Sequence, residues 1–246
     1  MIVMKRVKLL GYEIDTFDFD NAVVYATGLM QNDKVNQVVT INPEMFDTAK
    51  KDEEFSEILE NAELVIPDGI GVKIGLKICG ENVDRIAGVD FARRMINVAA
   101  EKSLPVALIG AKPEIIKKSV ENLCTEVPNL NIVYSHDGYF SDWDDIMDSL
   151  QRTSPRLILV ALGSPKQEKF IYEAKKQLNP ALMIGVGGSF DVWSGVTKRA
   201  PIIWQKMGLE WLYRTIKEPS RFKRIFPTLP LFLIQVIIEA IREKLG

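Results

Sequence analysis

The sequence predicts an α/β fold, with a mostly parallel sheet flanked by helices and a helical appendage at the C-terminus. Short apolar runs at 105–109, 131–134, 156–161 and 181–186 alternate with longer stretches of helical periodicity. Strands that alternate with helices of this length are typical of βαβ units, in which the strands run parallel. The pattern changes after Asp191, where aromatic and cationic residues replace the alternation.

The first hundred residues fit the same class less regularly. A strand or hairpin interrupted by glycine is expected at 8–14, and short buried strands are expected at 37–41 and 64–66. The spacing of apolar residues predicts helices at 18–30, 44–49, 52–60, 69–78 and 89–102. We therefore expect one α/β domain over residues 1–195 and a basic, aromatic helical appendage over residues 196–246.

Composition and charge limit the class of partner. The 246 residues are 47% hydrophobic and 26% charged, with a net charge of −2, which is ordinary for a globular protein and argues against nucleic-acid binding by the chain as a whole. From Thr197 onward, however, ten Lys and Arg stand against four Asp and Glu. That excess suits an anionic partner for the appendage: a phosphate, a nucleic acid or a membrane surface.

Cysteine, histidine and long apolar segments are scarce. Cys79 and Cys124 lack metal-ligand spacing, which favours a reduced, cytosolic location. His136 is the only histidine, which weakens a Ser-His-Asp proposal. No run reaches the roughly 18 apolar residues that a spanning helix needs, and the first residues lack the core of a signal peptide. We expect a protein that touches a membrane without crossing it.

Asp68 is the acidic residue most suggestive of chemistry. The apolar run at 64–66 reads as a buried strand, and Pro67, Asp68 and Gly69 follow it directly. Open α/β sheets bind ligands at the carboxyl ends of their strands. A carboxylate there could be a general base or the N-cap of the helix beginning near Ile70, and residues 65–71 alone favour the cap.

Other motifs have competing interpretations. The acidic pairs beginning at Asp18 and Asp142 match a metal-binding DxD pattern, but both open predicted helices, so we expect helix capping and no metal site. His136 is expected to be a hydrogen-bonded loop residue. Glycines at 69–71 and 185–188 lack the spacing of a dinucleotide fingerprint. Mixed Trp, Tyr, Phe and cations in the appendage fit core docking and a membrane interface equally.

Several segments together resemble the WecG/TagA/CpsF glycosyltransferases (glycosyltransferase family 26), with the TagA branch most similar. In chain order they are 40–44 (TINPE), 67–69 (PDG), 85–90 (RIAGVD), 138–140 (GYF), 161–169 (ALGSPKQEK), 185–191 (GVGGSFD), 199–201 (RAP), 208–214 (GLEWLYR) and 218–221 (EPSR). The resemblance spans nearly the whole chain. It implies a Rossmann-like fold, independence from metal or other cofactors, and an appendage that meets the membrane.

The resemblance also implies a reaction. N-acetylmannosamine would pass from UDP to N-acetylglucosamine linked through diphosphate to undecaprenol, with inversion and a β-1,4 linkage, as a step of wall teichoic acid assembly. The enzyme would be cytoplasmic and peripheral on the inner face of the cell membrane. A dimer or trimer is compatible with the apolar surface of the appendage, and no nucleic acid is implied.

Individual residues acquire roles by matching the motifs of the family. Asp68 matches the catalytic base. Residues expected to hold the two sugars are Thr40, Asn42, Arg85 and Gln167. A nucleotide cradle is expected from Gly110, Ala111, Gly138, Tyr139, Gly163, Gly187, Gly188 and Asp191. Appendage residues expected to reach the diphosphates are Arg214, Arg221 and Arg224, because guanidinium groups can neutralise a departing UDP.

Three alternatives remain open at this stage. The donor could be another UDP-sugar, carrying N-acetylmannosaminuronate, glucose or galactose, for capsule or exopolysaccharide synthesis. A nucleotide-binding, membrane-docked protein without catalysis would not need Asp68, Arg85 and Gln167 together. An NAD-dependent oxidoreductase is disfavoured by the missing fingerprint.

Overall fold

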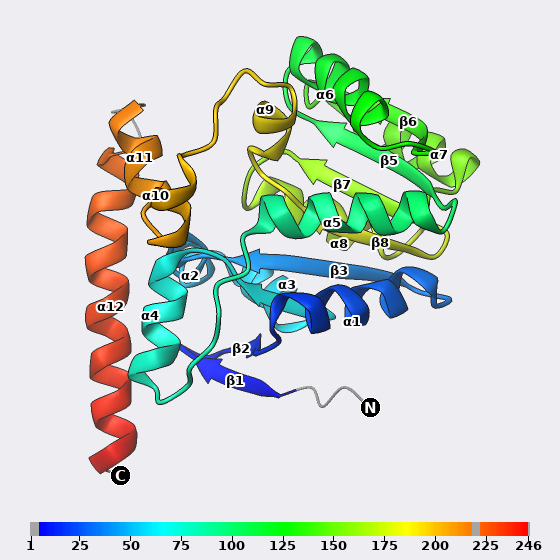
Figure 1. Ribbon diagram of the computed structural model, residues 1–246. Coiled ribbons are helices and arrows are strands. Elements are labelled where there is room, and N and C mark those ends of the chain that lie inside the picture. Colours follow the sequence, from blue (N-terminus) through cyan, green and yellow to red (C-terminus); the bar gives the residue numbers. More distant parts are fainter. Residues whose placement is uncertain (1–4, 218–221, 246) are drawn as a thin grey trace.

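A six-stranded parallel sheet forms the centre of the molecule (Figure 1), with strand order β4-β3-β8-β7-β5-β6. This computed structural model describes residues 5–217 and 222–245, without the side chains of residues 206, 214, 223–225 and 243–245. The strands are β3 (Val35–Ile41), β4 (Leu64–Pro67), β5 (Pro105–Gly110), β6 (Asn131–His136), β7 (Leu157–Ala161) and β8 (Ala181–Gly185). The predicted α/β class is confirmed.

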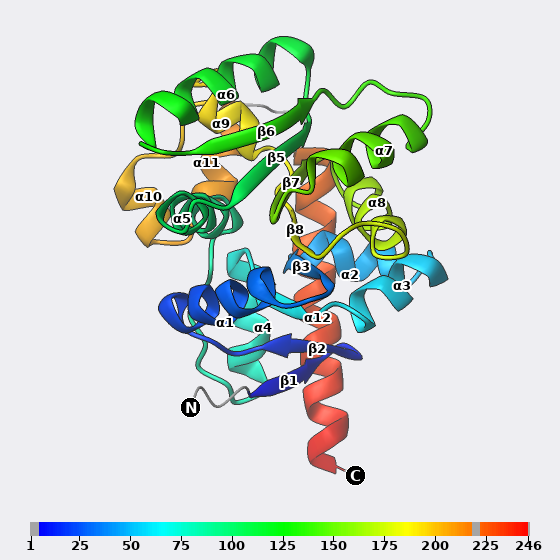
Figure 2. The ribbon, with the colours of Figure 1, turned by 90° about the vertical axis from the view of Figure 1, so that its right-hand side faces the viewer.

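Helices cover both faces of the sheet (Figure 2). Successive strand residues point to opposite faces, so Leu157 and Leu159 pack in one core cluster and Ile158 and Val160 in another. Helices of the first face are α1 (Phe19–Gln31), α5 (Gly88–Glu101) and α6 (Pro113–Glu126), and those of the second are α7 (Asp144–Thr153) and α8 (Lys166–Ala174). Burial on both faces explains why these strands are continuously apolar.

A third core cluster joins the N-terminal hairpin to the sheet. Strands β1 (Arg6–Leu9) and β2 (Tyr12–Asp15) are antiparallel, and Leu10 and Gly11 between them both have positive φ, as a two-residue hairpin turn of type I′ requires. The buried carboxylate of Asp15 accepts the Val65 N–H of β4 at 2.8 Å. Helices α2 (Pro43–Ala49), α3 (Glu53–Glu60) and α4 (Ile70–Ile78) complete this part of the molecule.

The acidic pairs open helices as predicted. Asp18 is the N-cap of α1, and its carboxylate accepts the N–H of Asn21 at 2.8 Å. The carboxylate of Asp142 accepts the N–H of Asp144 at 3.0 Å, where α7 begins. Capping therefore explains Asp18, whereas the N-cap of α7 is Trp143, no side chain caps that helix, and Asp142 stabilises the turn that precedes it.

The C-terminal segment forms α9 (Ser189–Trp193), α10 (Ile202–Lys206), α11 (Glu210–Lys217) and the long α12 (Phe222–Leu245). Helix α12 lies along α4 and α2 (Figure 1), and it buries Phe232, Val236 and Ala240. In the part of α12 that the structure describes, five other apolar residues form an exposed stripe: Leu231, Ile234, Ile237, Ile238 and Ile241. No helix among the described residues is both long and apolar enough to cross a membrane.

Phe232 is the side chain expected to hold α12 in place. It is 3% exposed, and its ring centroid lies 5.0 Å from that of Phe46 on α2. Phe232→Ala should weaken docking by roughly 3–5 kcal/mol and accelerate amide hydrogen exchange along α12. Leu231→Ala on the exposed side should change stability by no more than about 0.5 kcal/mol. Equal exchange in both variants would contradict this role of Phe232.

Candidate functional site

A cavity of about 690 Å³ opens at the carboxyl edge of the sheet. Ends of β3, β4, β5, β7 and β8 contribute to it, as does α11 from the C-terminal segment. Its size is that of a small-molecule site, and its place is where open α/β sheets bind ligands. Ten of the residues predicted from sequence line it: Thr40, Asn42, Asp68, Arg85, Ala111, Gly163, Gln167, Gly187, Gly188 and Asp191.

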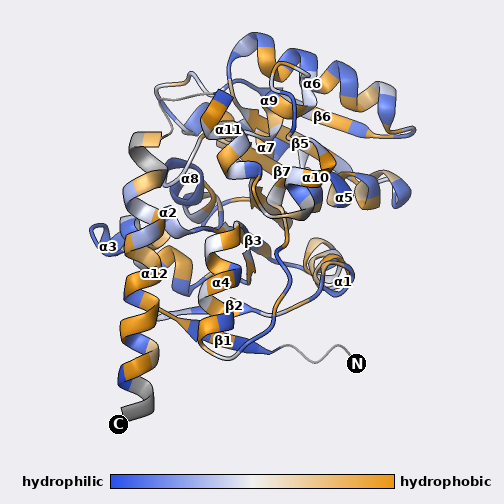
Figure 3. Ribbon diagram, turned by 60° about the vertical axis from the view of Figure 1, so that its left-hand side comes forward, coloured by the Kyte–Doolittle hydropathy of each residue, from blue (hydrophilic) through white to orange (hydrophobic). Residues whose placement is uncertain are grey.

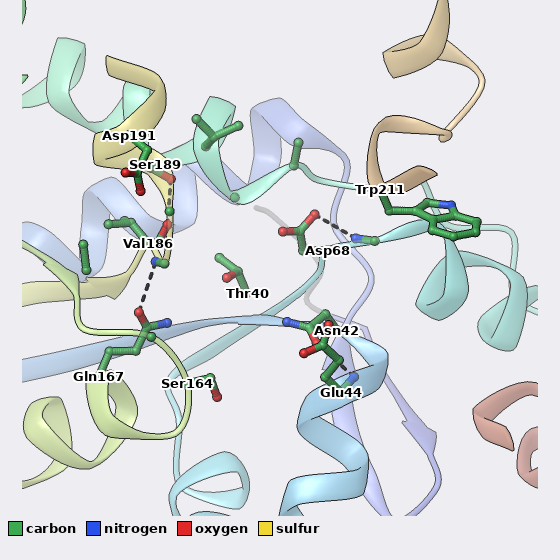
Figure 4. A pocket seen from close by; sticks show the side chains of 18 of the residues that line it. Thr40, Asn42, Glu44, Asp68, Ser164, Gln167, Val186, Ser189, Asp191 and Trp211 are labelled. Carbon is green, nitrogen blue, oxygen red and sulfur yellow. Dashed lines mark hydrogen bonds between the residues drawn. The ribbon is translucent and has the colours of Figure 1, made fainter. Parts of the chain in front are cut away.

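The cavity has two distinct ends (Figure 4). Asp68 and Trp211 lie at one end, and Gln167, Ser189 and Asp191 lie at the other, with Thr40 between them. The first end is built from the termini of β4 and α11, the second from the loops after β7 and β8. A ligand with two chemically different parts fits this arrangement.

Asp68 is not a helix cap. Helix α4 begins at Ile70, its N-cap is Gly69, and no side chain caps it. The Asp68 carboxylate instead accepts the N–H of the adjacent Gly69 at 2.7 Å, at a position where Gly69 has φ +85°. The cap favoured by the local sequence is therefore wrong, and the carboxylate is turned toward the cavity (Figure 4).

Burial is the main cause that raises the pKa of Asp68. The carboxyl keeps part of its surface open to the cavity, but it lies deep among protein atoms, which disfavours the charged form. The charge of Arg85 and the N–H groups of Gly69 and Gly88 lower the pKa in opposition, and Glu210 raises it further. A carboxylate that holds its proton more tightly than usual is suited to acid–base work near neutral pH.

Glu210 connects the C-terminal segment to this end of the cavity. Its Oε2 lies 3.6 Å from Nη2 of Arg85 and 3.2 Å from Nη2 of Arg199. Arg199 also pairs with both carboxylate oxygens of Asp90 in the first turn of α5. The ion pairs thus join α5, α11 and the loop bearing Arg85, with Glu210 buried at their centre.

Glycine turns form the opposite end. Gly163 and Gly187 line the cavity with positive φ, a conformation in which glycine is favoured. The N–H of Gly187 donates to Oε1 of Gln167 at 3.1 Å. Such turns present main-chain N–H groups, and these suit phosphate oxygens.

Three residues predicted for the nucleotide cradle do not line the cavity. Gly110 is required by packing, because a Cβ there would lie 2.3 Å from the carbonyl oxygen of Ala161. Gly138 donates its N–H to the carbonyl of Ala111 at 2.8 Å. The side chain of Tyr139 is 70% exposed. Gly110 precedes Ala111 in the chain and Gly138 bonds to it, so both support the loop that contains Ala111.

The three arginines predicted to reach the diphosphates lie in the segment where the structure describes the fewest side chains. The backbone of Arg214 belongs to α11 and that of Arg224 to α12, but their side chains lie outside the described residues, and Arg221 lies wholly outside them. His136 ends β6 with Nδ1 2.9 Å from the carbonyl oxygen of Asp137. It is hydrogen-bonded, as predicted, but it belongs to a strand and not to a loop, and it does not line the cavity.

Sequence reasoning missed several cavity residues, notably Glu44, Ser164, Glu210 and Trp211. Glu44 lies in the first turn of α2. It lies two residues after Asn42, at the carboxyl end of β3. That position was the sequence feature that could have identified it as a cavity residue. Glu210 and Trp211 reach the cavity only because the C-terminal appendage folds back onto the α/β domain. The spacing of apolar residues along the chain does not predict such a long-range contact. Among the residues that the structure describes, no group of three or more His, Cys, Asp or Glu side chains could hold a metal ion.

Fold and cavity define an α/β protein with a cavity at the carboxyl edge of its parallel sheet, where such folds commonly bind ligands. The model of the glycosyl transferase WecG/TagA/CpsF family matches residues 7–246, and the chain belongs to that family. It is accordingly a glycosyltransferase, as the sequence predicted.

Two curated relatives carry the same name, N-acetylglucosaminyldiphosphoundecaprenol N-acetyl-beta-D-mannosaminyltransferase. The protein from Bacillus subtilis (strain 168) is 38% identical over 213 residues, which are 86% of this chain and 83% of the relative. The protein from Bacillus spizizenii (strain ATCC 23059 / NRRL B-14472 / W23) is 34% identical over 212 residues, covering 86% and 82%.

The burial of Asp68 should have a cost in stability. Because its pKa is raised in the folded protein, the ionised carboxylate weakens the fold above that pKa, and this penalty disappears as the pH falls through it. Asp68→Asn should therefore raise the Tm of the free enzyme at neutral pH. A gain on the order of 1 kcal/mol corresponds to roughly 2–4 °C for a chain of this length.

Calorimetry over a pH series tests this expectation. The difference in Tm between variant and wild type should shrink toward acidic pH, where both side chains are neutral. A variant that is less stable than wild type at neutral pH would show that the ionised carboxylate supports the fold.

Proposed function

We propose that this glycosyltransferase moves N-acetylmannosamine from UDP to N-acetylglucosamine carried on undecaprenyl diphosphate, forming a β-1,4 linkage with inversion. The names of the two relatives support this donor sugar and acceptor. The observation that carries the mechanism is one partly buried carboxyl, Asp68, facing a cavity whose far end is lined by glycine turns. In this scheme the reaction is a step of wall teichoic acid assembly.

Asp68 is the proposed general base. It accepts the proton of the acceptor C4 hydroxyl while that oxygen bonds to the anomeric carbon, and the bond from that carbon to the β-phosphate oxygen breaks. UDP leaves from the opposite face with the bonding electrons. General-base assistance of this kind contributes on the order of 10²–10⁴-fold. One carboxylate is enough, because a diphosphate leaves without protonation.

The two ends of the cavity suit the two substrates. The turns at Gly163 and Gly187 offer main-chain N–H groups for the UDP phosphates, and Ala111, Gly188 and Asp191 adjoin them. Thr40, Asn42, Arg85 and Gln167 are proposed to hold the sugars. Arg214, Arg221 and Arg224 are proposed to neutralise the diphosphates, which lets the reaction proceed without a metal ion.

The appendage over residues 196–246 is proposed as a separate functional unit on the catalytic domain of residues 1–195. Figure 3 shows hydrophobic residues along α12, and the exposed stripe from Leu231 to Ile241 lies away from the core. An apolar stripe on a basic segment suits an anionic membrane surface. We propose a cytoplasmic enzyme, peripheral on the inner face of the membrane, whose stripe also permits a dimer or trimer.

A donor screen tests the proposed function. With EDTA present and a lipid-diphosphate-N-acetylglucosamine analogue as acceptor, UDP-N-acetylmannosamine should give a disaccharide-lipid by mass spectrometry, with a β linkage by NMR. Turnover with the UDP derivatives of glucose, galactose or N-acetylmannosaminuronate alone would replace the proposed donor. UDP binding without any turnover would support the non-catalytic alternative.

The exposed stripe should govern membrane binding and not chemistry. Replacing Ile234, Ile238 and Ile241 with serine should lower sedimentation with phosphatidylglycerol vesicles by at least tenfold, because each loses about 1.5–3 kcal/mol of apolar burial in lipid. Turnover of a water-soluble acceptor analogue should remain within about twofold. Val24→Ser on α1, which is also exposed, should leave both unchanged. Undiminished vesicle binding of the triple variant would contradict the proposed membrane face.

A further inference from the structure

Glu168 is a buried carboxyl that the proposed mechanism does not use. Only 2% of the residue is exposed, near the start of α8, and it does not line the cavity. Burying a carboxyl costs free energy unless it is neutral or well paired. A group placed there calls for a specific role.

Glu168 and its neighbour Gln167 form one unit. Oε1 of Glu168 accepts a hydrogen bond from Nε2 of Gln167 at 2.8 Å. On the other side of the same carboxamide, Oε1 of Gln167 accepts the N–H of Gly187 at 3.1 Å (Figure 4). Because one contact needs the amide nitrogen and the other needs the amide oxygen, together they specify a single orientation of the Gln167 carboxamide.

Gly185 supplies the space for this unit. A Cβ at Gly185 would lie 2.6 Å from Nε2 of Gln167 and 3.1 Å from Oε1 of Glu168. The two side chains therefore pack against the bare backbone of β8, one strand residue before Val186. Any larger residue at 185 would displace the carboxamide without changing a charge.

The contacts from Glu168 through Gln167 end at Gly187, which is part of the cavity wall. Gly187 has φ +49°, and Gly187 and Gly188 both line the cavity. The Gln167 carboxamide holds the N–H of Gly187 inward against α8, so it fixes the path of the turn that follows β8. The direction of the remaining N–H groups of that turn depends on this path.

We propose that Glu168 is a positioning residue: it orients Gln167, which fastens the Gly187–Gly188 turn in the shape that receives the donor nucleotide. The inference rests on the proposed function for the identity of that ligand, a nucleoside diphosphate. Glu168 acts through Gln167 and touches neither substrate.

The chemistry of the site favours a neutral Glu168. Burial raises its pKa, against the weaker opposing effects of the Gln167 and Ser164 side chains. Its Oε2 is buried without a partner in hydrogen-bond geometry among the described residues. A neutral group that accepts one hydrogen bond through Oε1 can be replaced by an amide of the same shape. An ionised carboxylate cannot.

Three full-length variants separate the possibilities: Glu168→Gln, Glu168→Ala and Gly185→Ala. Glu173→Ala is the control, since Glu173 lies on the same helix and pairs with Lys176 at the surface. UDP affinity is measured by calorimetry, and amide hydrogen exchange of residues 186–190 is measured without nucleotide.

Glu168→Ala and Gly185→Ala should weaken UDP binding about five- to tenfold, equivalent to about 1–1.4 kcal/mol, and should raise the KM for the donor but not for the acceptor. Both should accelerate exchange at 186–190. Glu168→Gln should stay within about twofold of wild type in every measurement, as should the control.

Two results would overturn the proposal. Glu168→Gln as damaging as Glu168→Ala would show that a charge is needed, and a lower Tm with unchanged exchange at 186–190 would leave Glu168 a purely structural group. Failure of the wild type to bind UDP would refute the proposed function instead, while the exchange comparison would still decide the role of Glu168.

Discussion

The structure of the site depends on holding the Asp68 carboxyl at the end of β4 in surroundings that resist its ionisation. The strand is buried on both faces, Pro67 ends it, and Gly69 takes a positive φ that turns the chain away. The carboxyl is thereby left facing the cavity, with the charge of Arg85 and the N–H groups of Gly69 and Gly88 as compensation. Those opposing effects leave the pKa of the Asp68 carboxyl raised, which suits its proposed role as a base, at a cost in stability.

The C-terminal segment completes this environment from outside the sheet. Glu210 approaches Arg85, which would otherwise compensate Asp68 alone, and Arg199 ties Glu210 to Asp90 on α5. An ion pair with so little solvent is sensitive to the loss of either partner. Docking of the appendage is therefore coupled to the electrostatics of the base through these ion pairs, and the same docking leaves the apolar stripe of α12 facing outward.

The sequence predicted the sheet well because short continuous apolar runs and the glycines that follow them are local signals. Asp68, Gln167 and Gly187 were also found, since each follows or adjoins a strand at its carboxyl end. Long-range contacts were not predicted: Glu210 enters the cavity from α11, and Phe232 packs against α2. Gly110 was predicted as a ligand contact, yet tertiary packing against Ala161 accounts for it. A glycine in a loop indicates that a side chain is not tolerated there. The sequence does not tell whether a bound ligand or a neighbouring part of the protein excludes it.

The most direct measurement compares wild type with Asp68→Asn in two assays on the same preparations: metal-free transfer from UDP-N-acetylmannosamine, and UDP binding by calorimetry. The account predicts that the variant loses transfer by at least 10²-fold, the lower end of general-base assistance, while its affinity for UDP stays within about twofold. The glycine turns that are proposed to bind UDP lie at the other end of the cavity from Asp68. The substitution should therefore lower transfer without lowering the affinity for UDP. Near-normal transfer by Asp68→Asn would contradict the central claim that this buried carboxyl is the base.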